Sequence, residues 1–186
     1  PELSQPHTIQ GFAYLSQTKI PKAITAFSNA INLNSATPLA RLGLGLAKIR
    51  KGDVKAGTRD IETAASLSPD NAIIRSYLGK AYYELKNKNH ATTELSIAKE
   101  MDPKDPTPWF YDAIIKQTTN RPIEALHAMQ KAIELNDNRG VYRSSLLLDN
   151  DLAARSSSLG RIYNDLGFQQ LGLVEGWKSV TTDPRN

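Results

Sequence analysis

The chain has 186 residues, of which 40% are hydrophobic and 23% are charged, the balance of a folded protein rather than of a disordered one. It contains no cysteine, which excludes disulfides, thiolate metal sites and cysteine nucleophiles. Its apolar runs are only a few residues long, so we expect no membrane insertion by these residues.

The formal net charge of +4 is concentrated near the N-terminus, because residues 1–60 hold eight Lys and Arg against three Asp and Glu. One interpretation is a surface for nucleic acid or anionic lipid. The other is a solvated edge of a helical hairpin, and we favour it because no aromatic residues alternate with these charges to stack on bases. No nucleic-acid partner is therefore predicted. The basic residues concerned are Lys48, Arg50, Lys51, Lys55 and Arg59.

Small and bulky residues recur every 34 positions along most of the chain. Small residues form the columns Ala23, Gly57, Ala91, Ala125 and Ala30, Ala64, Ala98, Ala132, together with Gly11, Gly45, Gly79, Ala113. Bulky residues form the column Phe27, Ile61, Leu95, Met129. A fixed period of this length predicts stacked helical hairpins, because one hairpin cannot bury its apolar faces alone.

The period predicts two antiparallel helices in each of the ranges 4–37, 38–71, 72–105 and 106–139. The third range carries the fullest set of marker residues: Leu78, Gly79, Tyr82, Ala91, Leu95, Ala98 and Pro103. The order of these residue types resembles the tetratricopeptide-repeat (TPR) family. The resemblance implies an all-α fold, a right-handed TPR superhelix of antiparallel hairpins. The fourth range departs most, with Asp112, Lys116 and Asp137 at marker positions.

A fifth, divergent hairpin is predicted at 153–186, where Leu159, Gly160, Tyr163 and Pro184 match the pattern. Pro184 lies 81 residues after Pro103, whereas two periods span 68. The thirteen extra residues predict a mostly irregular insert at 140–152. The second helix of this hairpin is the weakest match, although Leu171, Val174, Trp177 and Val180 still give it an apolar stripe.

The ends of the first helices are marked by residues that favour a left-handed backbone. Gly52 and Gly167 fall at this place in the second and fifth hairpins, and Asn120 is the usual substitute in the fourth.

No set of residues points to catalysis. His7, His90 and His127 fall at different positions of their repeats, so stacking does not gather them into a metal site. No serine or acidic residue forms a spaced set with a histidine base. We therefore expect no enzyme activity, no cofactor and no metal.

The resemblance also implies a binding groove, because the first helix of each TPR hairpin lines a concave face. Carried over by position, the residues of this predicted groove are Phe12, Leu15, Leu39, Leu42, Leu46, Ile49, Ile73, Lys80, Tyr83, Phe110 and Ile114. Most of them are apolar at positions expected to face water, and such patches usually mark interaction sites. The sequence thus predicts a scaffold for a protein or peptide ligand. The alternative occupant is the protein itself, from the insert or from a second copy by self-association.

Two further functions stay open. The stretch 141–168, running into 178–186, is similar to segments of bacterial cell-envelope proteins. This similarity implies a spacer in a larger envelope or secretion protein, a chain that continues past Asn186, and a periplasmic rather than cytoplasmic location. The third hypothesis is a regulatory array attached to a catalytic domain outside these residues.

Overall fold

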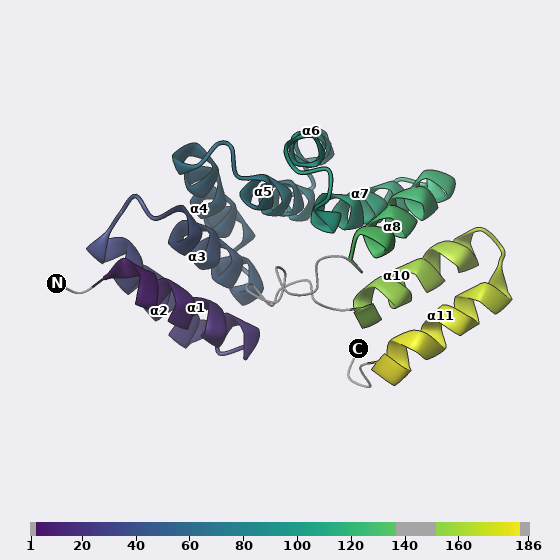
Figure 1. Ribbon diagram of the computed structural model, residues 1–186, viewed down its shortest axis with the longest axis horizontal. Coiled ribbons are helices and arrows are strands. Elements are labelled where there is room, and N and C mark those ends of the chain that lie inside the picture. Colours follow the sequence, from purple (N-terminus) through teal and green to yellow (C-terminus); the bar gives the residue numbers. More distant parts are fainter. Residues whose placement is uncertain (1–2, 137–151, 183–186) are drawn as a thin grey trace. The chain divides into compact units, whose positions relative to one another are not determined.

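The computed structural model describes residues 3–136 and 152–182, and every regular element in these two ranges is a helix (Figure 1). In chain order the helices are α1 (Ser4–Ser16), α2 (Ile20–Leu33), α3 (Pro38–Lys51), α4 (Val54–Leu67), α5 (Ala72–Glu84), α6 (Lys88–Met101), α7 (Pro106–Thr118), α8 (Pro122–Asn136), α10 (Leu152–Asp165) and α11 (Gln169–Thr182). The all-α prediction is confirmed for these ranges. The predicted insert lies outside the described residues, except that Leu152 begins α10.

Consecutive helices pair into hairpins: α1 with α2, α3 with α4, α5 with α6, α7 with α8, and α10 with α11. The contacts divide the chain into two compact units, residues 1–101 and residues 102–186. In the first unit α2 packs on α3 and α4 packs on α5, and in the second α8 packs on α10. A single continuous array over all five hairpins stays a prediction.

The small-residue columns mark the places where two helices of a hairpin approach closely. The alanines of these columns, Ala23, Ala30, Ala64, Ala91, Ala98, Ala125 and Ala132, are fully buried. In the α3–α4 pair, a Cβ built on Gly45 would lie 2.6 Å from the carbonyl oxygen of Gly57, and one on Gly57 would lie 2.5 Å from that of Gly45. Only glycine at both places permits this backbone contact.

The bulky column packs against the first helix of its own hairpin, as a Cβ built on Gly11, Gly45 or Gly79 shows by meeting Phe27, Ile61 or Leu95. Phe27, Ile61, Leu95 and Met129 are all buried. A Cβ on Gly11 of α1 or on Gly43 of α3 would meet the Phe27 ring, at 2.5 and 2.2 Å respectively. Phe27 of α2 is therefore held both by its own hairpin and by the first helix of the next one.

All five hairpins turn through a left-handed residue after the first helix. Gly52 (φ 104°), Gly167 (φ 83°) and Asn120 (φ 59°) confirm the sequence prediction, and Thr18 (φ 57°) and Lys86 (φ 63°) adopt the same conformation without a residue that favours it. Two backbone bonds accompany each turn; in the second hairpin the N–H of Gly52 donates to Ile49 and that of Asp53 to Lys48, both at 2.9 Å. These bonds satisfy the last carbonyls of the helix and fix the turn whatever the residue.

Candidate functional site

Four residues of the predicted groove, all in the first two hairpins, are buried. Phe12, Leu15, Leu42 and Leu46 are only 7, 0, 0 and 5% exposed, so the exposure expected of these four is not found. The Phe12 ring packs edge-on against Phe27 with ring centroids 5.0 Å apart. Glycines in α1 and α3 let both helices approach Phe27, and Phe12 packs on the same ring as part of this core.

The other predicted groove residues offer little open surface. Leu39 is 42% exposed, whereas the remaining six are half-buried: Ile49, Ile73, Lys80, Tyr83, Phe110 and Ile114. Phe110 packs on the apolar cluster of residues 102–186 that includes Ala113 and Met129. The two residues of α7 belong to that second unit, and the nine before them belong to the first.

The basic residues near the α3–α4 turn make structural contacts. Lys48 Nζ lies 2.6 Å from the carboxylate of the buried Asp60, and Arg41 lies 3.7 Å from the same group. The guanidinium of Arg50 donates to the backbone oxygen of Leu15 at 2.9 Å. These bonds connect α3 to α4 and to the end of α1. Some of the basic residues near the N-terminus thus have a structural role.

A polar hollow of about 450 Å³ lies beside α4 and α5, lined by Lys55, Thr58, Arg59, Glu62, Tyr82, Leu85 and Asn87. The Tyr82 hydroxyl donates to Glu62 Oε1 at 2.9 Å. Burial, and then this bond to the carboxylate, raise the pKa of Tyr82 to about 12. The phenol therefore stays protonated at neutral pH and joins the two hairpins as a hydrogen-bond donor.

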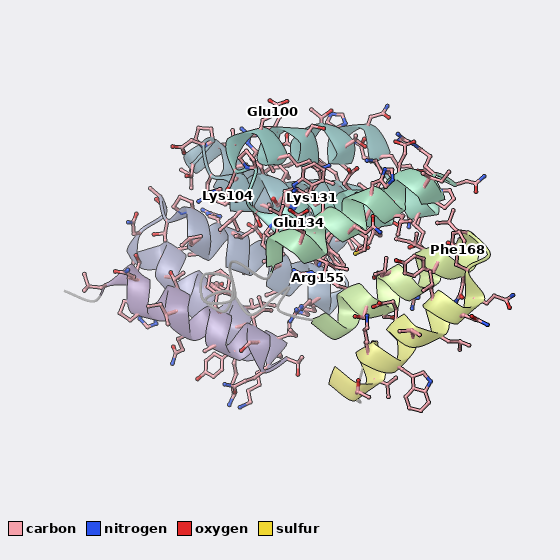
Figure 2. All side chains as sticks on the ribbon, turned by 45° about the vertical axis from the view of Figure 1, so that its right-hand side comes forward. Glu100, Lys104, Lys131, Glu134, Arg155 and Phe168 are labelled. Atoms are coloured by element: carbon pink, nitrogen blue, oxygen red, sulfur yellow. The ribbon has the colours of Figure 1, made fainter. Side chains whose placement is uncertain are left out.

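Helix α11 carries several large apolar side chains that are exposed. Leu173, Trp177 and Val180 are 66, 72 and 54% exposed. Together with Gly176 they line a shallow hollow of about 330 Å³, and we call these four residues the α11 stripe. In Figure 2 several side chains of α11 (yellow ribbon) project away from α10. The sequence showed apolar residues here but gave no sign that they face solvent.

The α11 stripe lies at repeat positions that, in other hairpins, contact the next hairpin along the chain. Four periods of 34 residues and the thirteen-residue insert separate Phe27 from Gly176, so the two residues occupy equivalent positions. Phe27 contacts Gly43 of the following hairpin. Trp177 corresponds to Glu62, which bonds Tyr82 of the following hairpin. The α11 stripe is thus a junction face, and no following hairpin covers it within the part of the chain that the structure describes.

Within residues 3–136 and 152–182, no group of three or more His, Asp and Glu side chains is placed to hold a metal ion. None of the helices in these ranges is both long enough and apolar enough to cross a membrane.

No family model matches the chain. Among solved structures, it is similar to TTC0263, a thermophilic TPR protein of Thermus thermophilus, with a TM-score of 0.83 and 18% identity over 98% of this chain and 93% of that one. It is similar to a chain in the APC/C hetero-tetramer Cut9–Hcn1, with a TM-score of 0.84 and 19% identity over 100% of this chain and 34% of that one. MamA MSR-1 gives a TM-score of 0.60 and 19% identity, covering 98% of this chain and 97% of that one.

One curated relative is anaphase-promoting complex subunit 3 of Schizosaccharomyces pombe (strain 972 / ATCC 24843), 25% identical over 104 residues. The match covers 56% of this chain and only 16% of that protein.

The helical hairpins and these structural similarities define an α-solenoid fold. More closely, the fold is that of the tetratricopeptide-repeat proteins, as the repeat pattern predicts. The similarity to cell-envelope segments and the periplasmic location stay predictions.

Proposed function

We propose that this TPR chain is a protein-interaction scaffold that holds a helix of its partner on the α11 stripe. The observation that carries the proposal is the exposure of Leu173, Trp177 and Val180 around one hollow. Contiguous exposed apolar side chains of this size usually mark an interaction surface, and tryptophan is enriched among the residues that dominate binding. A helix is the favoured ligand because the corresponding positions of α2 and α4 pack on helices α3 and α5.

The predicted groove supports binding less well than the α11 stripe does. Of its eleven residues, Leu39 alone is largely exposed, and four are buried in the first unit. A ligand there would find almost no exposed apolar surface on Leu42 and Leu46. We therefore place the primary binding surface on α11 rather than on the first helices of residues 1–101.

We assign the scaffold no catalytic step. His7, His90 and His127 lie on α1, α6 and α8, so no two of them share a helix as candidate bases. The two other hypotheses, a spacer in an envelope protein and a regulatory array for an external catalytic domain, stay alternatives to the scaffold.

Affinity capture with a stripe variant tests the proposal. The tagged chain is used as bait in a lysate of its source cells, as the wild type and as Leu173→Ser/Trp177→Ser, and captured proteins are quantified by mass spectrometry. We expect specific partners to bind the wild type and to be lost from the double variant. Equal capture by both baits would show that binding takes place elsewhere.

The matched control is Val174→Ser, on the same helix. Val174 is 50% exposed, but it occupies a position at which the other hairpins also face solvent, with Thr25, Arg59, Thr93 and His127. This variant should capture the same partners as the wild type. Circular dichroism checks that all three baits keep the same helix content.

A further inference from the structure

We infer that the α11 stripe binds α1 of a second copy of this chain, so that copies join head to tail. The inference rests on the proposed scaffold function and names the occupant of its binding surface. It makes the chain's own first helix the ligand, seated as α3 is seated on α2.

Helix α1 presents to solvent the face that the following first helices bury. Its exposed residues on this face are Pro6, Ile9, Gln10 and Ala13. One period later, Ala40, Gly43, Leu44 and Ala47 of α3 are all buried, and two periods later so are Ile74, Tyr77, Leu78 and Ala81 of α5. In α3 and α5 this face packs against the second helix of the preceding hairpin. Among the helices that the structure describes, none covers this face of α1, and α11 has the kind of surface that could.

The sizes of the side chains on the two faces are complementary. Where α2 meets α3, the large Phe27 ring fills the place opposite Gly43. At the proposed junction Gly176 of α11 stands in the place of Phe27, and Ile9 of α1 stands in the place of Gly43. The small residue is therefore on the second helix and the large one on the first. A Cβ built on Gly176 meets nothing within 4 Å, and Ile9 is 65% exposed. The Ile9 side chain can enter the hollow that the missing side chain of Gly176 leaves.

The proposed junction buries no unpaired formal charge. Helix α1 contains no Asp, Glu, Lys or Arg. The charged residues of α11 are Glu175 and Lys178, whose side chains pair at 2.6 Å. Because desolvating an unpaired charge is costly, two faces without one are well suited to stay in contact.

A contact between two different faces does not close on itself after two copies. Each added copy carries a new α11 stripe and a new α1 face, so the assembly grows with concentration unless it forms a ring. A symmetric α11–α11 dimer would instead stop at two copies and leave α1 uncovered. Mass as a function of concentration separates these cases.

The test mixes two variants that are each blocked at one end. Ile9→Ser blocks the α1 face and Trp177→Ser blocks the α11 stripe; both positions are exposed, so folding should be retained. By sedimentation velocity up to a few hundred micromolar, the wild type should exceed dimer mass. Each variant alone should associate at least about tenfold more weakly. An equimolar mixture should form a 1:1 dimer and nothing larger, because one intact α1 face and one intact α11 stripe remain.

Two further variants strengthen the test. Ala13→Glu blocks the α1 face independently and should behave as Ile9→Ser does. Val174→Ser should assemble like the wild type.

Three results would overturn the inference. Self-association of Ile9→Ser at wild-type strength would indicate a symmetric α11 contact, and failure of the mixture to dimerise would exclude α1 as the ligand. A wild type that stays monomeric throughout would exclude a second copy. In that last case, stripe-dependent capture of another protein would leave the scaffold proposal standing. If neither self-association nor stripe-dependent capture is found, both the head-to-tail inference and the scaffold proposal are wrong.

Discussion

At the scale of single residues, the hairpin turn is decided by backbone hydrogen bonds more than by residue type. Thr18 and Lys86 hold φ values of 57° and 63° where two other hairpins use glycine. A left-handed conformation costs a residue with a Cβ about 1–2 kcal/mol, and most for a β-branched residue such as threonine. Because the same two N–H groups are satisfied in every hairpin, the turn persists despite this cost.

Replacing Thr18 by Gly should therefore stabilise the protein. We expect a gain of about 0.5–1 kcal/mol in the free energy of unfolding, since the relief of strain exceeds the added freedom of the unfolded chain. The converse change, Gly52→Ala, should cost about 1 kcal/mol, because a Cβ there meets nothing within 4 Å and only backbone strain is added. Urea unfolding followed by circular dichroism measures both. A loss of stability in Thr18→Gly together with a gain in Gly52→Ala would show that the turns are not under strain.

Because of Tyr82, we expect the free energy of unfolding to fall at alkaline pH. Its pKa is raised to about 12 in the folded protein, from 10.0 in the unfolded chain, so the folded state retains the proton more tightly. This contribution is fully present below pH 10 and is lost as the pH rises toward 12. Between pH 9 and about pH 11.5, the urea midpoint should fall less for Tyr82→Phe than for the wild type. Equal falls would show that the Tyr82–Glu62 bond contributes nothing.

At the scale of the helices, close packing depends on glycine only where a backbone stands opposite. Gly45→Ala should destabilise by about 1–3 kcal/mol, because its Cβ would press on the carbonyl oxygen of Gly57 and force α3 and α4 apart. Gly176→Ala is the matched control, since open space surrounds it, and should gain about 0.5–1 kcal/mol as a helix-interior change. Thermal or urea unfolding compares them. Equal effects would mean that the α3–α4 contact is not tight.

The helices also show what sequence reasoning could reach. The period of 34 predicted the helices, the buried alanine columns and the bulky column, because the first four hairpins repeat the same residue types. It did not reveal that Leu42 is buried or that Trp177 is exposed. Periodicity identifies an apolar face, but whether another segment covers that face depends on neighbours that the pattern does not encode. The turns at Thr18 and Lys86 were missed because neither residue type favours a left-handed backbone.

At the scale of the whole molecule, the first and the last described hairpin each expose an apolar face whose equivalents in other hairpins are buried. The α1 face and the α11 stripe carry residues whose equivalents in other hairpins make contacts between hairpins. In a repeat fold each hairpin uses its neighbours to complete its core, so a face of this kind is built to receive another helix. The binding function proposed for α11 is therefore an extension of the contacts that hold the fold together.

The measurement that tests this account most directly is the urea unfolding of two double variants, Leu42→Ser/Leu46→Ser and Leu173→Ser/Trp177→Ser. The first pair is 0 and 5% exposed and the second pair 66 and 72% exposed. We predict that the first variant loses about 4 kcal/mol or more of stability, because buried apolar side chains are removed. The second should stay within about 0.5 kcal/mol of the wild type. Unchanged stability of Leu42→Ser/Leu46→Ser, with partner capture lost, would contradict the account and place binding in the groove that the sequence predicted.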